Sequence, residues 1–205
     1  YANIDGIYNP SEAFDASSFS NPLDKWLISI TEKLVLDVTR EFDDYDLASS
    51  IPKMVSYIDE LNNWYIRRSR RRFWKSENDS DKKEAYTALY SALKRFSLLF
   101  APVLPFITEN IWQNLRKEEE PISIHLADYP LYDEKRRDEE LEFKMATVQK
   151  AISMARSLRY QFNLKIRQPL KAIEIVTRNQ KEKAVLLEME DSIIEELNVK
   201  EVIFH

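Results

Sequence analysis

Glycine is nearly absent from this 205-residue sequence, which contains a single one, Gly6. Average usage of roughly 7% would give about fourteen. Because glycine lowers helix stability by about 1 kcal/mol relative to alanine, such scarcity favours a mainly helical protein. It also excludes the Gly-rich loops that bind phosphates in P-loop and dinucleotide-binding proteins.

Cysteine is absent altogether, and histidine occurs only at His125 and His205. These absences exclude a disulfide framework, a thiol nucleophile and a cysteine-based zinc site within the sequence. His125 has one potential metal ligand three or four residues away, Asp128. Carboxylates are abundant, but no pair is distinguished as a general acid and base. We therefore expect no catalytic site and no cofactor or metal in this chain.

Long apolar runs are missing as well. No stretch of about 18 apolar residues is present, and the sequence does not open with a charged and then apolar leader. We expect a soluble, cytoplasmic protein without a membrane partner. Because the sequence begins with Tyr1 rather than methionine, we also expect a fragment of a longer polypeptide.

Apolar residues at three- and four-residue spacing predict four helices, which cover about 21–43, 46–77, 82–100 and 105–115. Asn21 is a suitable N-cap, with Pro22 at the first helical position. Pro52 lies inside the second predicted helix, where it predicts a kink or a later start. Four helices joined by short turns fit an up-and-down helical bundle.

The pattern changes in the last third of the sequence. A long fifth helix is predicted over about 134–162, and alternating β-branched residues then predict short strands at 171–176 and 199–205, with helix between them. The predicted fold is mainly α, a helical bundle with a small C-terminal α+β appendage. We divide the chain into an irregular lead-in (1–20), the helical bundle (21–133), and a long helix with a β–α–β subdomain (134–205).

The most informative segment is LNNWYIRRSRRRFWK, residues 61–75. The net charge of the chain is −5, yet this segment has five arginines within six positions and no acidic residue. At about 100° per residue, one arc of roughly 140° collects most of its basic side chains together with a tryptophan. The members of this arc are Trp64, Arg67, Arg68, Arg71, Arg72 and Lys75. Arg70 lies off the main arc.

Two interpretations of this basic arc remain open. The arginines can form a solvated face that pairs with acidic neighbours such as Asp43, Asp44 and Glu60. Alternatively, because closely spaced like charges repel one another, the arc can serve a polyanion, whose phosphates arginine binds bidentately. Trp64 and Trp74 could then stack on bases, or they could pack against neighbouring helices.

Four segments of the sequence resemble, in order, the region after the catalytic core of isoleucyl-tRNA synthetases. They are NPLDKWLISITEKL (21–34), LNNWYIRRSRRRFW (61–74), APVLPFITENIWQNL (101–115) and LKIRQPL (164–170). The opening YANIDGIYNP (1–10) resembles the segment just past that core. PFITENIW is shared with the valine and leucine enzymes, whereas WYIRRSRRRFW and KIRQPL are similar to the isoleucine enzyme, in its eukaryote-like branch.

The resemblance implies a helical module that binds the anticodon stem and loop of tRNA(Ile). It also implies a catalytic domain of the same polypeptide that uses ATP and Mg²⁺ and carries HIGH and KMSKS motifs. Neither motif occurs here, so the isolated chain is predicted to be inactive in aminoacylation. The candidate tRNA-binding residues are Trp64, Tyr65, Arg67, Arg68, Arg70, Arg71, Arg72, Lys75, Lys165, Arg167 and Gln168. The alternative is an interaction domain whose basic helix docks on the catalytic domain.

Overall fold

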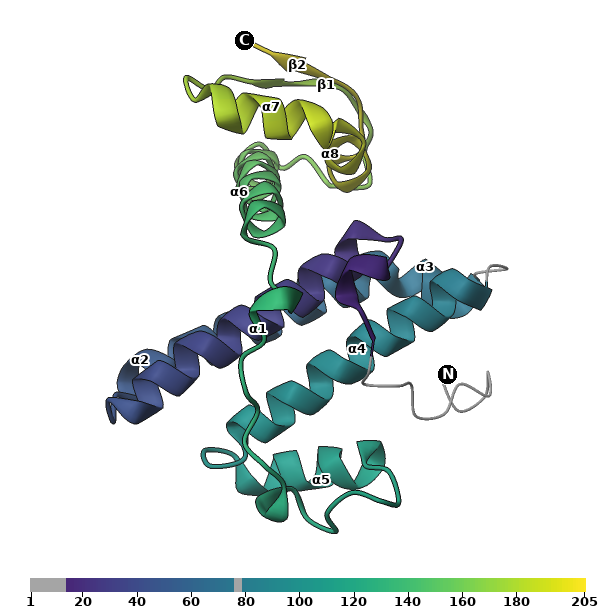
Figure 1. Ribbon diagram of the computed structural model, residues 1–205. Helices are drawn as coiled ribbons and strands as arrows, with labels where there is room; N and C mark the ends of the chain where they lie inside the picture. The colour runs from purple at the N-terminus through teal and green to yellow at the C-terminus, as the bar shows by residue number, and fades with distance from the viewer. Residues whose placement is uncertain (1–13, 76–78) are drawn as a thin grey trace. The chain divides into compact units, whose positions relative to one another are not determined.

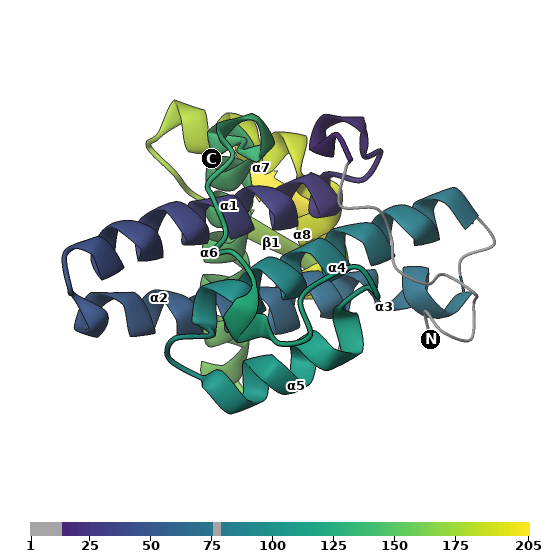
Figure 2. The same cartoon turned by 60° about the horizontal axis from the view of Figure 1, so that its bottom comes forward.

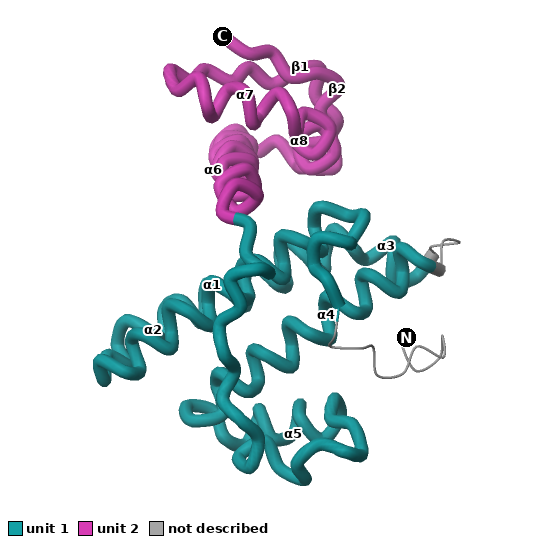
Figure 3. Tube along the Cα trace, in the orientation of Figure 1, with its two compact units in different colours: residues 1–138 teal, residues 139–205 magenta. Residues whose placement is uncertain are grey.

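The structure, a computed structural model, describes residues 14–75 and 79–205. The chain divides into two compact units, residues 1–138 and residues 139–205 (Figure 3). Most of the irregular lead-in assigned to residues 1–20 lies outside the described residues; its last part contains a short 3₁₀ helix, η1 (Ala16–Ser18).

The first unit is built from helices (Figure 1). Its longer elements are α1 (Pro22–Asp43), α2 (Leu47–Asp59), the π-helical segment η2 (Glu60–Ile66), α3 (Arg67–Lys75), α4 (Asp79–Phe100) and α5 (Pro105–Leu115). Two 3₁₀ turns follow, η3 (Ile124–Leu126) and η4 (Glu134–Arg136). Helix α2, η2 and α3 run on without a break, so together they form the second long rod of the bundle.

Local signals explain where the first two helices begin. The Asn21 side chain accepts a hydrogen bond from Leu23 N, and Pro22 occupies the first turn of α1, where its missing N–H is not needed. The Asp46 side chain accepts from Ser49 N and caps α2 in the same way. The helix continues through Pro52, so the proline neither ends nor delays it.

Helix α1 is the centre of the first unit and packs against both α2 and α4, while α4 in turn packs against α5 (Figures 1 and 2). Trp26 and Leu27 on α1 are buried, as are Leu99 and Phe100 on α4. Burial of such large side chains contributes roughly 1.5–3 kcal/mol each relative to exposure. This apolar packing fixes how the helices of the unit lie against one another.

Two buried charged groups join helices to loops. Glu32 on α1 is fully buried, and its Oε2 accepts hydrogen bonds from Arg95 Nη2 on α4 at 2.8 Å and from Asp133 N at 3.0 Å. Burial raises the pKa of Glu32 despite the neighbouring Arg95 charge. Lys94, 3% exposed, forms an ion pair with Glu120. These contacts hold the loops that follow α5 against the helices.

The apolar spacing of the second predicted helix places Leu47, Ile51, Met54, Val55 and Ile58 on one side, but that side is not buried as a whole. Met54 and Tyr57 are 1% and 2% exposed, as part of the core. Leu47, Ile51, Val55 and Ile58 are instead 36–56% exposed. The helix carries more apolar surface than α1 can cover, because its partner contacts only one arc of it.

The second unit begins with the long helix α6 (Glu139–Gln161) and continues as β1 (Leu170–Ile175), α7 (Gln180–Glu188), α8 (Glu190–Leu197) and β2 (Val199–Phe204). The two strands pair in parallel, from Leu170 opposite Val199 to Ile175 opposite Phe204. A parallel pair needs a crossover connection, which α7 and α8 supply. Asn198 adopts the left-handed conformation (φ 50°) that ends α8 and leads into β2.

The predicted fold class is confirmed: a helical bundle is followed by a small α+β part. The sequence-based division placed the end of the bundle at residue 133, and the structure divides after Asp138. Among the described residues, no helix is both long and apolar enough to traverse a bilayer.

Candidate nucleic-acid interface

The π-helical turn η2 determines which residues of α3 face solvent. Buried residues recur every four positions through this rod: Tyr57, Leu61, Tyr65, Ser69 and Phe73. In an uninterrupted α-helix, sixteen residues at about 100° each would turn Phe73 roughly 160° away from Tyr57. The wider π turn takes up that difference, because its hydrogen bonds span five residues rather than four. Both ends of the rod therefore bury the same side.

The solvent side of α3 carries three arginines, Arg67, Arg70 and Arg71, whose side chains are exposed. Trp74 lies on the same side and is 56% exposed. At about 100° per residue these four positions fall within an arc of roughly 100°. We call Arg67, Arg70 and Arg71 the α3 arginine face. Arg70 thus belongs to the exposed face, contrary to the prediction that it lies off the main arc.

Arg72 points the other way and is held by two carboxylates. Its Nη1 and Nη2 donate to the two carboxylate oxygens of Asp24 at 2.8 and 2.7 Å, and its Nε donates to Asp81 Oδ2 at 2.9 Å. The side chain is 12% exposed, and Asp24 is fully buried. Although burial opposes the charge, hydrogen bonds to Asp24 and Asp81 raise the pKa of Arg72. Its charge is thus paired with two carboxylates of the protein, and Arg72 is not part of the exposed side of α3.

Tyr65 completes this buried network from η2. Its hydroxyl donates to Asp24 Oδ1 at 2.7 Å, and the ring is fully buried. Burial and the Asp24 charge raise the pKa of Tyr65 well above its ordinary value, so the hydroxyl keeps its proton. The network therefore ties three elements, α1, η2 and α3, to one carboxylate. By fixing α3, it sets the orientation of the α3 arginine face.

Trp64 also differs from its predicted place on the basic arc. Its side chain is 6% exposed, and the Arg68 guanidinium lies over its ring at 4.7 Å from the centroid. The π turn rotates Trp64 inward, and Arg68, which is half-buried, covers it. In this conformation Trp64 is not available to stack on a base, and only part of the Arg68 side chain is exposed to solvent.

The remaining predicted residues lie in three places. Lys75 ends α3, and its side chain lies outside the described residues. Lys165, Arg167 and Gln168 are exposed in the second unit, on the segment between α6 and β1. The α3 arginine face and this segment belong to separate units, so each is treated as a surface of its own.

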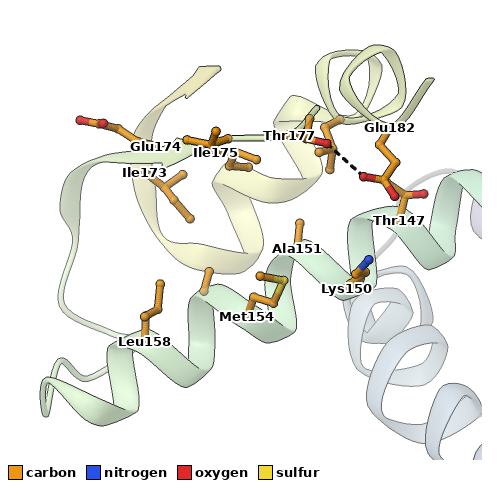
Figure 4. Close-up of a pocket in the computed structure, with 13 residues that line it drawn as sticks. Thr147, Lys150, Ala151, Met154, Leu158, Ile173, Glu174, Ile175, Thr177 and Glu182 are labelled. Atoms are coloured by element: carbon orange, nitrogen blue, oxygen red, sulfur yellow. Dashed lines mark hydrogen bonds between the residues drawn. The ribbon is translucent and has the colours of Figure 1, made fainter. Parts of the chain in front are cut away.

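A cavity of about 280 Å³ lies in the second unit, between α6 and β1. Figure 4 shows Ala151, Met154 and Leu158 of α6 facing Ile173 and Ile175 of β1, with Lys150 and Glu182 at one end. Glu182 accepts a hydrogen bond from Thr177 Oγ1 at 3.1 Å. The lining is mostly apolar, and Thr177 and Glu182 form a hydrogen-bonded polar pair within it.

Among residues 14–75 and 79–205, no three His, Cys, Asp or Glu side chains converge as potential ligands of a metal ion. His125 is exposed at a 3₁₀ turn. The surface that stands out chemically is therefore the α3 arginine face, three cations on a rigid helix next to a half-exposed tryptophan.

Comparison with known proteins matches residues 24–175 to the family model described as the anticodon-binding domain of tRNA ligase. This range runs from the first turn of α1 to the end of β1.

Curated relatives match over the whole chain. The isoleucine–tRNA ligase of Treponema denticola is 69% identical over 215 residues, which cover 100% of this chain and 20% of that protein. The isoleucine–tRNA ligase of Treponema pallidum is 55% identical over the same coverage. That of Dehalococcoides mccartyi is 43% identical over 203 residues, which cover 98% of this chain and 20% of the relative. The chain thus spans about a fifth of the length of these relatives.

Proposed function

The chain belongs to the isoleucine–tRNA ligase family, of which it carries the anticodon-binding domain, and we propose that it binds the anticodon stem and loop of tRNA(Ile). The family match supports RNA as the partner. The observation that carries the proposal is the α3 arginine face: three exposed guanidinium groups whose helix is held in place by the buried Arg72 network.

Arginine suits this role because its planar fork donates two parallel hydrogen bonds to phosphate oxygens. Arg70 and Arg71 follow Arg67 by three and four residues, so both lie one turn beyond it, on either side of its position, within one arc of α3. Such a cluster of guanidinium groups suits the phosphates of a nucleic acid rather than its base edges. We therefore assign the α3 arginine face to phosphate contacts, and Arg72 to holding the helix.

The full-length ligase provides the setting for this binding. We propose that the domain positions tRNA(Ile) for aminoacylation by a catalytic domain of the same polypeptide, which uses ATP and Mg²⁺ in the cytoplasm. The sequence lacks the HIGH and KMSKS motifs, so we expect the chain to be inactive in aminoacylation on its own. Lys165 and Arg167, exposed in the second unit, are proposed as further tRNA contacts.

A fluorescence-anisotropy titration of the chain with labelled tRNA(Ile) and with a non-cognate tRNA tests the proposal. We expect preference for tRNA(Ile) and an affinity that falls with salt. Three phosphate contacts alone predict a loss of roughly 20- to 40-fold between about 50 and 200 mM salt. Arg71→Ala should weaken binding by at least about tenfold, since charge-assisted hydrogen bonds contribute about 1.5–3 kcal/mol.

Arg40→Ala is the matched control. Arg40 is exposed on α1, sixteen residues and therefore about 24 Å along the helix from Asp24, which marks the end of α1 that lies next to α3. Its loss removes one positive charge without touching the α3 arginine face and should leave affinity within twofold. If the chain binds the separate catalytic domain through α3 and no tRNA, the arginine face is a protein-docking surface and the proposal is wrong.

A further inference from the structure

The end of helix α6 exposes two aromatic rings that the family motifs do not include. Tyr160 is 86% exposed and Phe162 is 71% exposed. Among the described residues, neither ring stacks on another aromatic ring or lies beneath a cation. We call residues 160–169, which run from the last turn of α6 to the residue before β1, the α6 tip.

The backbone of the α6 tip is tightly held. Arg159, 6% exposed, directs its guanidinium inward, and Nη2 donates to the carbonyl oxygens of Lys165 and Gln168, both at 2.5 Å. Asn198 Nδ2 donates to Ile166 O at 3.2 Å from the start of β2. These hydrogen bonds fix the backbone of the α6 tip, and the two rings are exposed in that fixed conformation.

The sequence around the α6 tip is positively charged. Residues 143–173 contain seven lysines and arginines and no aspartate or glutamate. Arg156 pairs with Glu196, and Arg159 is directed inward. Three other cations are exposed on the tip and the start of β1: Lys165, Arg167 and Lys171. In the described part of the chain, none of these three side chains forms an ion pair.

We propose that the α6 tip binds unpaired nucleotides of an RNA strand, with bases stacked on Tyr160 and Phe162 and phosphates held by Lys165 and Arg167. Every base has a flat face, so aromatic side chains bind single strands by stacking, and neighbouring cations hold the backbone. Paired bases already stack on one another, which leaves the unpaired ones as partners for the rings. The inference rests on the proposed function for the choice of RNA as the polyanion, and it adds the class of nucleotide and the two stacking side chains.

The test is an anisotropy titration of the 205-residue chain with labelled decauridine and with a fully paired, blunt-ended RNA duplex of about ten base pairs. We expect decauridine to bind more tightly than the duplex. Stacking on one aromatic ring contributes at least about fivefold in affinity. Tyr160→Ala with Phe162→Ala should therefore weaken decauridine binding at least tenfold, with circular dichroism unchanged.

Two controls separate stacking from simple loss of an exposed apolar group. Tyr160→Phe keeps the ring and should stay within twofold of the wild type. Leu131→Ala removes an 82% exposed apolar side chain from the first unit and should also have no effect. Unchanged decauridine affinity in the double alanine variant, or equal loss in the Leu131→Ala control, overturns the inference.

A cross-linking experiment keeps the test decisive should the double variant fold poorly. Decauridine containing 4-thiouridine, irradiated with the unaltered chain, should cross-link to the peptide that spans residues 160–168. Cross-links confined to α3 or elsewhere overturn the inference.

The α3 variant Arg70→Ala with Arg71→Ala distinguishes this inference from the proposed function. It should lose affinity for tRNA(Ile) and keep its affinity for decauridine. If tRNA(Ile) binds through α3 and decauridine does not bind, the inference fails and the proposed function stands. If decauridine binds and tRNA(Ile) does not, the proposed function fails while the α6 tip remains a single-strand site.

Discussion

Arg72→Ala should lower the free energy of unfolding, whereas Arg71→Ala, at the neighbouring position, should leave it nearly unchanged. Removing Arg72 leaves the Asp24 carboxylate fully buried with its charge partner gone. Breaking a buried ion pair on one side destabilises a protein by about 3–5 kcal/mol. Tyr65 would still donate to Asp24 Oδ1, so we expect the lower half of that range. Arg71 is exposed, and its loss should change stability by no more than about 0.5 kcal/mol.

Urea denaturation at pH 7, followed by circular dichroism and tryptophan fluorescence, measures both variants. A loss of about 3 kcal/mol corresponds to a drop of roughly 6–12 °C in Tm for a chain of this size. Asp24→Asn in the Arg72→Ala background should restore part of the loss, because it removes the unpaired buried charge. If Arg72→Ala keeps its wild-type stability but loses RNA affinity, Arg72 contacts phosphates and the account of the buried network is wrong.

Two further predictions concern pH. Burial raises the pKa of Glu32, so ionisation of this carboxyl destabilises the fold as pH rises from about 4.5. Glu32→Gln should therefore become more stable relative to the wild type between pH 4 and pH 7. Urea midpoints of the two proteins that stay equally far apart over this range would contradict the prediction. Although burial opposes the charge of Glu120, hydrogen bonds from Lys94 Nζ and Lys117 N lower its pKa, so its stabilising effect is lost as pH falls below about 4.5. Lys94→Met should make the loss of stability between pH 5 and pH 3 shallower, and an unchanged acid limb would show that the pair contributes nothing.

Helix boundaries could be read from the sequence because they depend on neighbouring residues. The cap at Asn21 forms as predicted, and the helix predicted to begin at about residue 46 is capped by Asp46. Local alternation also predicts the two strands β1 and β2, whose parallel pairing the structure adds. These signals act over a few residues, and a single sequence displays them directly.

Local signals could not predict which residues belong to the α3 arginine face. A helical period of 3.6 residues places Trp64 among the arginines, whereas the π turn in η2 moves it inward. The four-residue repeat of Tyr57, Leu61 and Tyr65 was the available signal for a wider turn. Arg72 depends on Asp24, 48 residues earlier, and no local pattern indicates such a pairing.

The central claim is that the α3 arginine face binds the backbone of the anticodon stem. The most direct test is the salt dependence of binding to the isolated anticodon stem and loop of tRNA(Ile), for the wild type and for a variant with Arg67, Arg70 and Arg71 all replaced by alanine. The account predicts that the slope of log affinity against log salt is smaller by about 3 in the variant, one for each phosphate contact, while the melting temperature stays the same. Equal slopes for two equally folded proteins would contradict it.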